Sequence, residues 1–166
     1  MKILVLGGSG FLGSHVCDTL TKDGHIVTIY DLKKSKWIKN NQKMIIGSIL
    51  DSNKLKKIIK KNDIIYNFAA LADLDQAVKN PIQSVKTNIL GTALLLHICK
   101  KYKIKRFIQA SSIYAGSSQG GFYSASKRAS EDYIKEYKNL YGVDYTILRY
   151  GTVYGPRSDM SNGVKN

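Results

Sequence analysis

A glycine-rich segment close to the start of the chain limits most strongly what the protein can fold into. Residues 7–13 read Gly-Gly-Ser-Gly-Phe-Leu-Gly, so glycines recur at positions 7, 10 and 13. The segment follows an apolar run at residues 3–6 and precedes residues 11–21, where apolar side chains recur at helical spacing. Glycine permits a tight turn and close packing of a helix on a strand. We therefore expect a strand, a sharp turn and a helix as the first unit.

The rest of the chain alternates between short apolar runs and helical patterns. We expect further strands at residues 26–30, 44–46, 64–68, 106–110 and 145–148. We expect helices after a cap at Asp51 or Ser52, from Asn80-Pro81 onward, and from Tyr123 to Tyr141. This alternation is typical of a parallel sheet with helices packed on it. The sequence therefore predicts an α/β fold, a doubly wound parallel sheet of the Rossmann type with helices on both faces.

The charge of the chain is strongly positive, with 26 Lys and Arg against 12 Asp and Glu and a formal net charge of +14 in 166 residues. Such a balance is compatible with nucleic-acid binding. However, no nucleic-acid-binding motif accompanies the charge, and the lysine-rich stretches lack interleaved aromatic residues for base stacking. We therefore interpret the lysines as solvated surface that attracts an anionic small molecule such as a nucleotide, and we expect no nucleic-acid partner.

Other features of the composition exclude several classes of protein. No run of about 18 apolar residues occurs, so we expect no membrane span. The two cysteines, Cys17 and Cys99, are too few for a disulfide framework and do not have metal-ligand spacing. The three histidines are scattered along the chain, so we predict no metal site. These observations favour a cytoplasmic protein.

The glycine segment has a chemical interpretation as well as a structural one. A helix that begins at such a turn directs free N–H groups at an anion, which suits the pyrophosphate of a dinucleotide. Asp31 ends the second predicted strand, 21 positions after Gly10, where a carboxylate can accept from a ribose 2′-OH. The negative charge of Asp31 disfavours a 2′-phosphate and favours NAD over NADP, while Lys33 and Lys34 act in the opposite direction. A glycine turn without a ligand is the alternative interpretation.

A tyrosine and a lysine follow at the spacing Tyr123-x-x-x-Lys127. Residues four apart share one face of a helix. An ammonium beside a phenol favours the phenolate and so lowers a pKa that is ordinarily about 10. A phenolate can take a proton from a substrate hydroxyl. Ser112 ends the fifth predicted strand, where the ligand crevice of an open α/β sheet lies.

In these motifs the chain resembles the extended short-chain dehydrogenase/reductases, in particular the NAD-dependent sugar-nucleotide epimerases and dehydratases. The resemblance covers residues 1–157. It rests on Gly7-x-x-Gly10-x-x-Gly13, Asp31, Asn67-Phe68-Ala69-Ala70, Asn88, Ser111-Ser112, Tyr123-x-x-x-Lys127 and the segment from Leu148 to Pro156.

The resemblance implies a role for each of these residues. Ser112 is expected to orient the substrate, Tyr123 to act as the base, and Lys127 to bind the nicotinamide ribose and tune Tyr123. The expected cofactor-binding residues are Gly7, Gly10, Phe11, Leu12, Gly13, Asp31, Ser48, Ile49, Phe68, Ala69, Ala70, Asn88, Tyr123, Lys127 and Tyr150. Residues 1–150 are expected to form the NAD-binding domain, and residues 151–166 the start of a truncated substrate-binding region.

The resemblance also implies an activity and its alternatives. The expected reaction is NAD-dependent epimerisation of a nucleotide sugar through a transient keto intermediate, and a homodimer is an expected assembly. A reductase or dehydratase of the same family, or an NAD-binding module without autonomous activity, remains an alternative. Three positions depart from the family pattern: Ser48 replaces a common Asp, Thr152 replaces a common Asn, and Ile113-Tyr114 stand where the 4,6-dehydratases have Asp-Glu.

Overall fold

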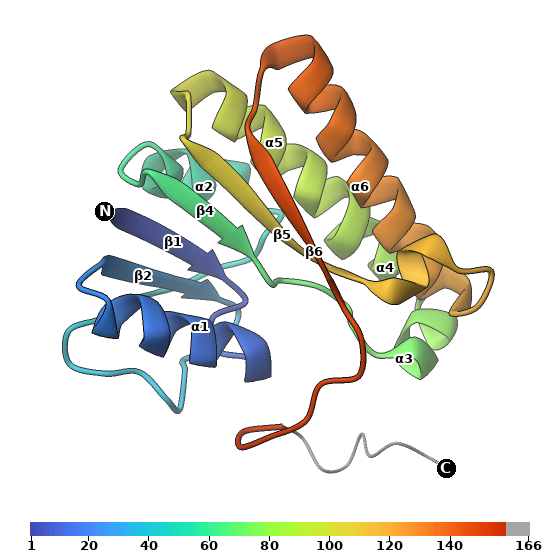
Figure 1. Ribbon diagram of the computed structural model, residues 1–166, viewed down its shortest axis with the longest axis horizontal. Coiled ribbons are helices and arrows are strands. Elements are labelled where there is room, and N and C mark those ends of the chain that lie inside the picture. Colours follow the sequence, from blue (N-terminus) through green and yellow to red (C-terminus); the bar gives the residue numbers. More distant parts are fainter. Residues whose placement is uncertain (159–166) are drawn as a thin grey trace.

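One parallel sheet of six strands organises the computed structural model, which describes residues 1–158. The strands are β1 (Lys2–Leu6), β2 (Ile26–Asp31), β3 (Lys43–Ile46), β4 (Ile64–Asn67), β5 (Arg106–Ser112) and β6 (Tyr145–Tyr150). They lie in the order β3-β2-β1-β4-β5-β6, and each neighbouring pair is parallel. Figure 1 shows the part of this order from β2 to β6. The order reverses between β1 and β4, so the predicted doubly wound parallel sheet is confirmed.

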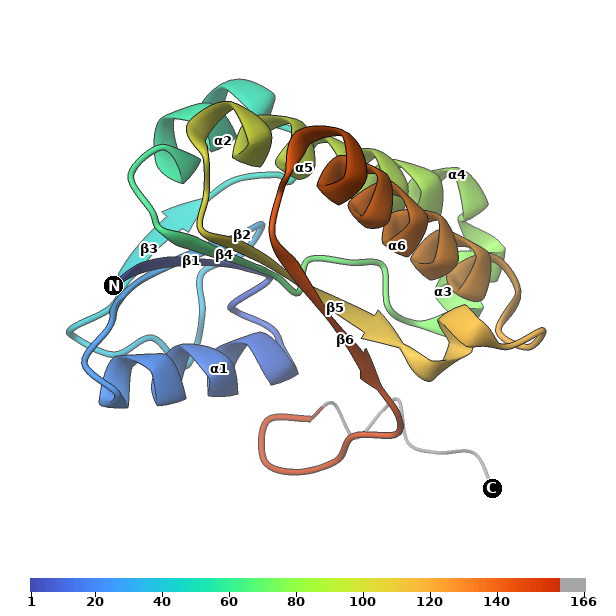
Figure 2. The same cartoon turned by 45° about the horizontal axis from the view of Figure 1, so that its top comes forward.

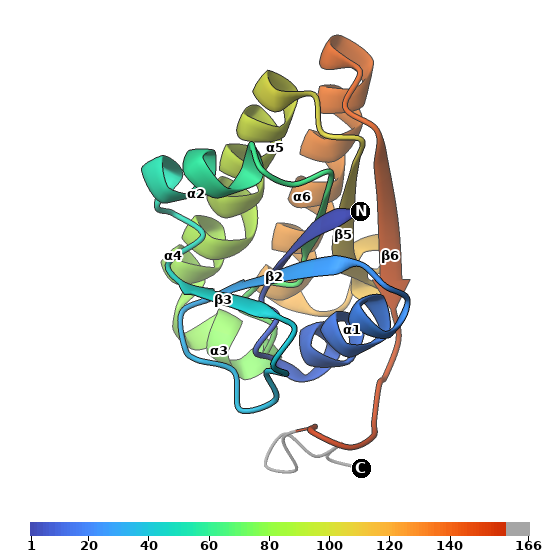
Figure 3. The ribbon, with the colours of Figure 1, turned by 90° about the vertical axis from the view of Figure 1, so that its left-hand side faces the viewer.

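Helices cover both faces of the sheet. Helix α1 (Phe11–Lys22) lies on one face, and α2 (Ser52–Ile59), α5 (Gly91–Tyr102) and α6 (Gly121–Tyr141) lie on the other (Figure 2). Viewed from the β3 side in Figure 3, α1 and α2 lie on opposite sides of β2. The Asp51 side chain accepts a hydrogen bond from Lys54 N at 2.9 Å, which caps α2 as the sequence predicts.

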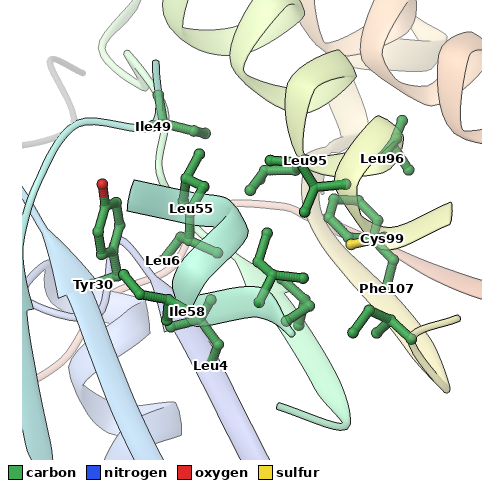
Figure 4. Close-up of a cluster of buried hydrophobic side chains, with 14 of the residues drawn as sticks. Leu4, Leu6, Tyr30, Ile49, Leu55, Ile58, Leu95, Leu96, Cys99 and Phe107 are labelled. Carbon is green, nitrogen blue, oxygen red and sulfur yellow. The ribbon is translucent and has the colours of Figure 1, made fainter. Parts of the chain in front are cut away.

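The apolar run in β1 explains why this strand is central. Side chains alternate between the two faces of a strand, so Leu4 and Leu6 enter the cluster beneath α2 and α5, which Figure 4 shows. Ile3 and Val5 enter a second cluster beneath α1. All four side chains are almost completely buried. A strand buried on both faces needs a continuous apolar sequence, and residues 3–6 supply it.

The segment after β4 differs from the single helix that the sequence predicts. The chain forms α3 (Leu74–Lys79), α4 (Pro81–Ser84), a π-helical turn η1 (Val85–Leu90) and then α5. The π-helical turn spans only six residues, which is too short for a change of period to be detected in the apolar spacing. A 3₁₀ turn, η2 (Ile113–Gly116), was likewise not predicted, because so short an element has no detectable period.

The last described segment, residues 151–158, is called here the strap. It turns back from β6 toward α1 (Figure 1). His15 Nε2 donates to the Pro156 carbonyl at 2.8 Å, and Arg157 donates to the Asp18 carboxylate at 2.8 Å. The Arg157 guanidinium also lies 4.9 Å from the centre of the Trp37 ring. The rest of the predicted substrate-binding region, residues 159–166, lies outside the described residues.

Candidate functional site

A cavity of about 720 Å³ opens at the carboxyl ends of β1, β2 and β4. Its walls include Asp31 at the end of β2, the segment from Ser48 to Leu50 after β3, and Phe68, Ala69 and Ala70 after β4. This is the position at which the strand order reverses, where open α/β sheets bind their ligands. The volume is in the range of small-molecule and cofactor sites.

A second cavity, of about 480 Å³, continues the first toward β5. The two cavities share Gly7, Gly10, Phe11, Phe68 and Ala70. The second cavity is also lined by Leu12, Gly13, Ser112, Tyr123, Lys127 and Tyr150. We call the two together the cleft. It brings the glycine segment and the Tyr-Lys pair, more than 100 positions apart in the sequence, to one continuous space.

Glycine is needed at positions 7, 10 and 13 of the turn for different structural reasons. Gly7 has a φ of +72°, and a Cβ atom there would lie 2.6 Å from the backbone N of Ala69. A Cβ atom on Gly13 would lie 2.3 Å from the Gly7 carbonyl oxygen, so close packing of α1 on the turn requires glycine there. At Gly10 the nearest atom is the Gly7 carbonyl oxygen at 3.3 Å, and the residue lines both cavities. A side chain at Gly10 would therefore project into the cleft.

Asp31 connects β2 to the glycine turn. One carboxylate oxygen accepts from the Ser9 backbone N–H at 3.0 Å, and the other lies 3.4 Å from the backbone N of Lys33. A carboxylate has about four lone-pair positions, so Asp31 retains capacity for ribose hydroxyl groups in the first cavity. Lys33 and Lys34 line the same cavity, as do Lys36, Trp37 and Arg157.

Lys127 is buried at the floor of the second cavity, with 4% of its surface exposed. Its Nζ donates to the Ala110 carbonyl of β5 at 2.9 Å and lies 5.6 Å from the centre of the Tyr123 ring. Burial lowers the pKa of Lys127 to about 8, and the negative charge of Glu131 acts in the opposite direction. The site therefore holds an ammonium group whose proton is unusually easy to remove.

Tyr123 differs from the sequence-based expectation in one respect. Its pKa is raised above the ordinary value because burial disfavours the phenolate, while a hydrogen bond with Ser112 acts in the lowering direction. The expected lowering of the Tyr123 pKa is therefore wrong for this structure. Burial is the larger effect, and the Lys127 ammonium donates its hydrogen bond to the Ala110 carbonyl. The predicted association of Tyr123, Lys127 and Ser112 in one cavity is nevertheless present.

Asn88 lies behind the wall of the cleft rather than in it. It is buried in the π-helical turn, and neither cavity is lined by it. Its side-chain amide donates to the Leu71 carbonyl at 3.1 Å and to Ser126 Oγ at 2.8 Å, and it accepts from Leu71 N at 2.8 Å. Asn88, which we expected among the cofactor-binding residues, therefore braces the segment that follows Ala70 against α6.

Several residues at the site escaped the sequence-based prediction. Glu131 is buried beside Lys127, and Arg149 forms an ion pair with it at 2.6 Å. The spacing of four between Lys127 and Glu131 was available as a signal. Trp37 and Arg157 had no such signal, because their proximity depends on the path of the strap.

Within residues 1–158, the His, Cys, Asp and Glu side chains form no group of three or more that could hold a metal ion. No helix among these residues combines the length and apolar character needed to cross a bilayer.

A parallel sheet with a glycine turn at its switch point and a Tyr-Lys pair beside the end of β5 defines a class, the dinucleotide-binding short-chain dehydrogenase/reductases. Comparison with known proteins gives the family within that class. The chain belongs to the NAD dependent epimerase/dehydratase family, whose model matches residues 3–165. The family is NAD-dependent, and the resemblance inferred from the sequence motifs is confirmed.

Individual relatives agree with this assignment. A putative UDP-glucose 4-epimerase of Methanocaldococcus jannaschii is 35% identical over 95% of this chain and 57% of its own length. The UDP-glucose 4-epimerase of Thermotoga maritima, solved with UDP-glucose, superimposes with a TM-score of 0.89 at 34% identity, over 96% of this chain and 58% of that one. The Thermus thermophilus enzyme, solved with NAD, gives a TM-score of 0.87 at 29% identity over the same shares. The chain thus spans less than two thirds of these relatives' length.

Proposed function

We propose that this chain carries the cofactor site and the catalytic residues of an enzyme that epimerises a nucleotide sugar, at C4 of the hexose ring. One observation carries the proposal: Ser112, Tyr123 and Lys127 open on the same cleft as the glycine turn. A base at one end of a dinucleotide cleft fits an oxidation followed by a reduction of one carbon atom.

The residues of the cleft fit NAD. The open side of Gly10 leaves room for a pyrophosphate at the N-terminus of α1. Asp31 would accept from the hydroxyls of the adenosine ribose, and Lys127 would bind the nicotinamide ribose. When bound, NAD supplies the acceptor and later the donor of a hydride. Asp31 favours NAD over NADP through like-charge repulsion of a 2′-phosphate.

The side chains of this protein would handle the proton and the orientation of the sugar. The phenolate form of Tyr123, a minor form at neutral pH because burial raises the pKa, takes the proton of the C4 hydroxyl while the C4 hydride leaves, which gives a 4-keto sugar. The Ser112 hydroxyl donates a hydrogen bond to the reacting oxygen and keeps it in place. The keto sugar then rotates in the cleft and presents its other face. The hydride returns to the opposite face of C4, and Tyr123 returns the proton. The product is the C4 epimer, with no net change in redox state.

The second cavity supports epimerisation over dehydration. Among the described residues, no Asp or Glu lines this cavity. Ile113 and Tyr114, which follow Ser112, form the 3₁₀ turn η2, and the Tyr114 ring packs edge-on against Tyr123. Elimination of water from a keto sugar needs an acid and a base besides Tyr123, and this turn does not supply them.

A second candidate function is an NAD-binding module without autonomous catalysis. In that case the same cleft would bind NAD but would not turn over a nucleotide sugar.

Self-association is part of the proposal. The helical turn that bears Asn88 and the helix that bears Tyr123 both expose large apolar side chains, Val85 and Leu90 on the first and Phe122 and Tyr133 on the second. Burial of such side chains against a second copy is favourable. This exposure is consistent with the homodimer expected from the resemblance.

The proposal is tested by two measurements on the same sample. Trp37 is the single tryptophan of the chain and lines the first cavity, so its fluorescence reports NAD binding directly. Formation of UDP-galactose from UDP-glucose, and the equivalent reaction of other UDP- and GDP-sugars, reports epimerisation. We expect binding and turnover with the wild-type chain, and binding without turnover with Tyr123→Phe. Binding without turnover in the wild type would select the NAD-binding module instead. Gly10→Asp should abolish the fluorescence response, and an unchanged response would refute the glycine-turn assignment.

A further inference from the structure

A buried carboxylate close to the Tyr-Lys pair has no part in the reaction described above. Glu131 lies on α6, one helical turn after Lys127, and only 2% of its surface is exposed. Glutamate is almost never fully buried unless it is paired. The chain therefore maintains a charge in its interior next to the base.

Three hydrogen bonds from the two neighbouring strands fix this carboxylate. Arg149 of β6 donates from Nε at 3.0 Å and from Nη2 at 2.6 Å, one bond to each carboxylate oxygen. Ser111 of β5 donates from its hydroxyl at 2.6 Å. Burial alone would raise the pKa of Glu131, but the hydrogen bonds from Arg149 and Ser111 outweigh it and hold the pKa below its ordinary value. Glu131 is thus negatively charged at neutral pH.

Strand β5, which provides Ser111, also accepts a hydrogen bond from Lys127. The Lys127 ammonium donates to the carbonyl of Ala110, the residue directly before Ser111. Lys127 and Glu131 are four apart on α6, so they share one face of the helix. Burial works against the charged form of Lys127, and the carboxylate of Glu131 works in its favour.

Apart from burial, the charge of Glu131 is the cause that acts on the pKa of Lys127, although other polar groups surround the pair. Lys135, on the same helix, also lowers the pKa of Glu131 through its positive charge. The groups that surround the pair from the packed elements are the hydroxyls of Ser111 and Ser112 on β5, the guanidinium of Arg149 on β6, the phenol of Tyr123 on α6 and, through Ser126, the neutral amide of Asn88 on η1.

We propose that Glu131 is a positioning residue for the epimerisation: fixed by Arg149 and Ser111, its carboxylate keeps Lys127 charged beside Tyr123. This inference rests on the proposed function. Between pH 8 and the higher pKa of Tyr123, the pair is mainly phenol with amine, and the active form, phenolate with ammonium, holds the same number of protons. Their ratio depends on the difference between the two pKa values. Glu131 is one turn from Lys127 and two turns from Tyr123, so its charge favours the ammonium more than it disfavours the phenolate, and the active form gains.

The first experiment follows Lys127 itself and needs no catalytic activity. The chain is labelled with ¹³C at the lysine Cε, and the chemical shifts are followed by NMR between pH 6 and pH 11. Lys127→Met identifies the Lys127 signal by its loss. We expect Glu131→Gln to move the Lys127 titration to lower pH. Glu136→Gln is the matched control, because it removes the same charge from an exposed position of the same helix, and we expect it to leave the titration in place. An unchanged titration in Glu131→Gln overturns the proposal.

A second variant covers the event that Glu131→Gln does not fold, as judged by circular dichroism. Glu131→Asp keeps the charge but withdraws it by one methylene group, so the Lys127 titration should move in the same direction by a smaller amount. A titration at or above the wild-type position in Glu131→Asp overturns the proposal.

The second experiment measures the consequence for the reaction. In Glu131→Gln we expect kcat at pH 9, where phenol with amine predominates, to fall about tenfold, the effect of a one-unit change in the pKa difference. The KM for the nucleotide sugar and the affinity for NAD should not change, and Glu131→Asp should recover part of the rate. A purely structural role would instead lower thermal stability and leave the pH profile of kcat unchanged. A wild-type chain without turnover would contradict the proposed function, while the NMR titration would still decide the role of Glu131.

Discussion

At the scale of single residues, two glycines with the same backbone conformation have different importance. Gly7 and Gly24 both have positive φ, +72° and +80°. A Cβ atom on Gly7 would meet the backbone of Phe68 and Ala69, whereas a Cβ atom on Gly24 would have no neighbour within 4 Å. The comparison separates backbone strain, which the two positions share, from close packing, which only Gly7 has.

We therefore predict that Gly7→Ala and Gly24→Ala differ in stability. Each substitution carries the left-handed penalty of about 1–2 kcal/mol. Gly7→Ala should lose a further amount of about 1–3 kcal/mol, because backbone of the β4 end must move to admit the methyl group. Urea unfolding of the two variants measures the difference. Equal free energies of unfolding would mean that the turn does not pack against Phe68 and Ala69 as described.

Lys127 illustrates how a catalytic group can weaken the fold that contains it. Its pKa is about 8 in the folded protein, from an ordinary value of 10.5. Below pH 8 the folded state therefore holds a buried charge at a cost. Between pH 8 and pH 10.5 the unfolded chain binds more protons than the folded one, so this group makes stability rise with pH.

Lys127→Met should accordingly be more stable than the wild type at pH 7, by about 2–3 kcal/mol. The difference should shrink steadily as the pH rises from 8 to 10, because the wild-type lysine is then neutral when folded. Urea unfolding at a series of pH values tests this, and other titrating groups cancel in the comparison. A difference that is independent of pH would contradict the assigned pKa of Lys127.

At the scale of elements, the strap contacts parts of the chain that lie far from it in the sequence. Arg157 contacts Asp18 on α1 and Trp37 in the loop after β2, and it lines the first cavity. Burial raises the pKa of Asp18, but hydrogen bonds from Arg157, Gln42 and Lys39 outweigh it and leave the pKa below its ordinary value. The pairing is thus made by a charged carboxylate.

We predict that Arg157→Ala releases the strap without unfolding the domain. Proteolysis within residues 151–158 should become faster, and NAD affinity should fall severalfold, because Arg157 and Ser158 line the cleft. Lys39→Ala is the control, since Lys39 pairs with the same Asp18 oxygen but is 54% exposed and such pairs contribute about 0–1 kcal/mol. Equal proteolysis of both variants would show that Arg157 does not fix the strap.

The elements also show what the sequence could and could not predict. The six strands and the helices α1, α2 and α6 were predictable, because each has a continuous or periodic apolar pattern in its sequence. The π-helical turn was not, since six residues are too few to show a period of their own. The motif residues of the site were predictable from spacing. The Glu131–Arg149 pair and the strap contacts depend on how distant segments meet, which no local pattern records.

At the scale of the whole molecule, the exposed apolar side chains on η1 and α6 bear on assembly. Val85 is 49% exposed in η1, and Leu140 is 68% exposed near the end of α6. If the homodimer forms through the helices that bear Asn88 and Tyr123, a charge near Asn88 should prevent it.

We predict a dimer in sedimentation analysis of the wild type and a monomer for Val85→Glu, because a carboxylate buried without a partner is strongly unfavourable. Leu140→Glu introduces the same charge away from η1 and should remain dimeric. A wild type that sediments as a monomer at all concentrations would refute the proposed self-association, as would a dimer of Val85→Glu.

At the scale of the reaction, the proposed epimerisation requires that a single hydride leave C4 of the sugar and return to it. The most direct test uses UDP-glucose with deuterium at C4, incubated with the chain and NAD and followed by NMR. The account predicts UDP-galactose that retains deuterium at C4, and none with Tyr123→Phe. Product that has exchanged this deuterium for solvent hydrogen, or no conversion by a chain that binds NAD, would contradict it.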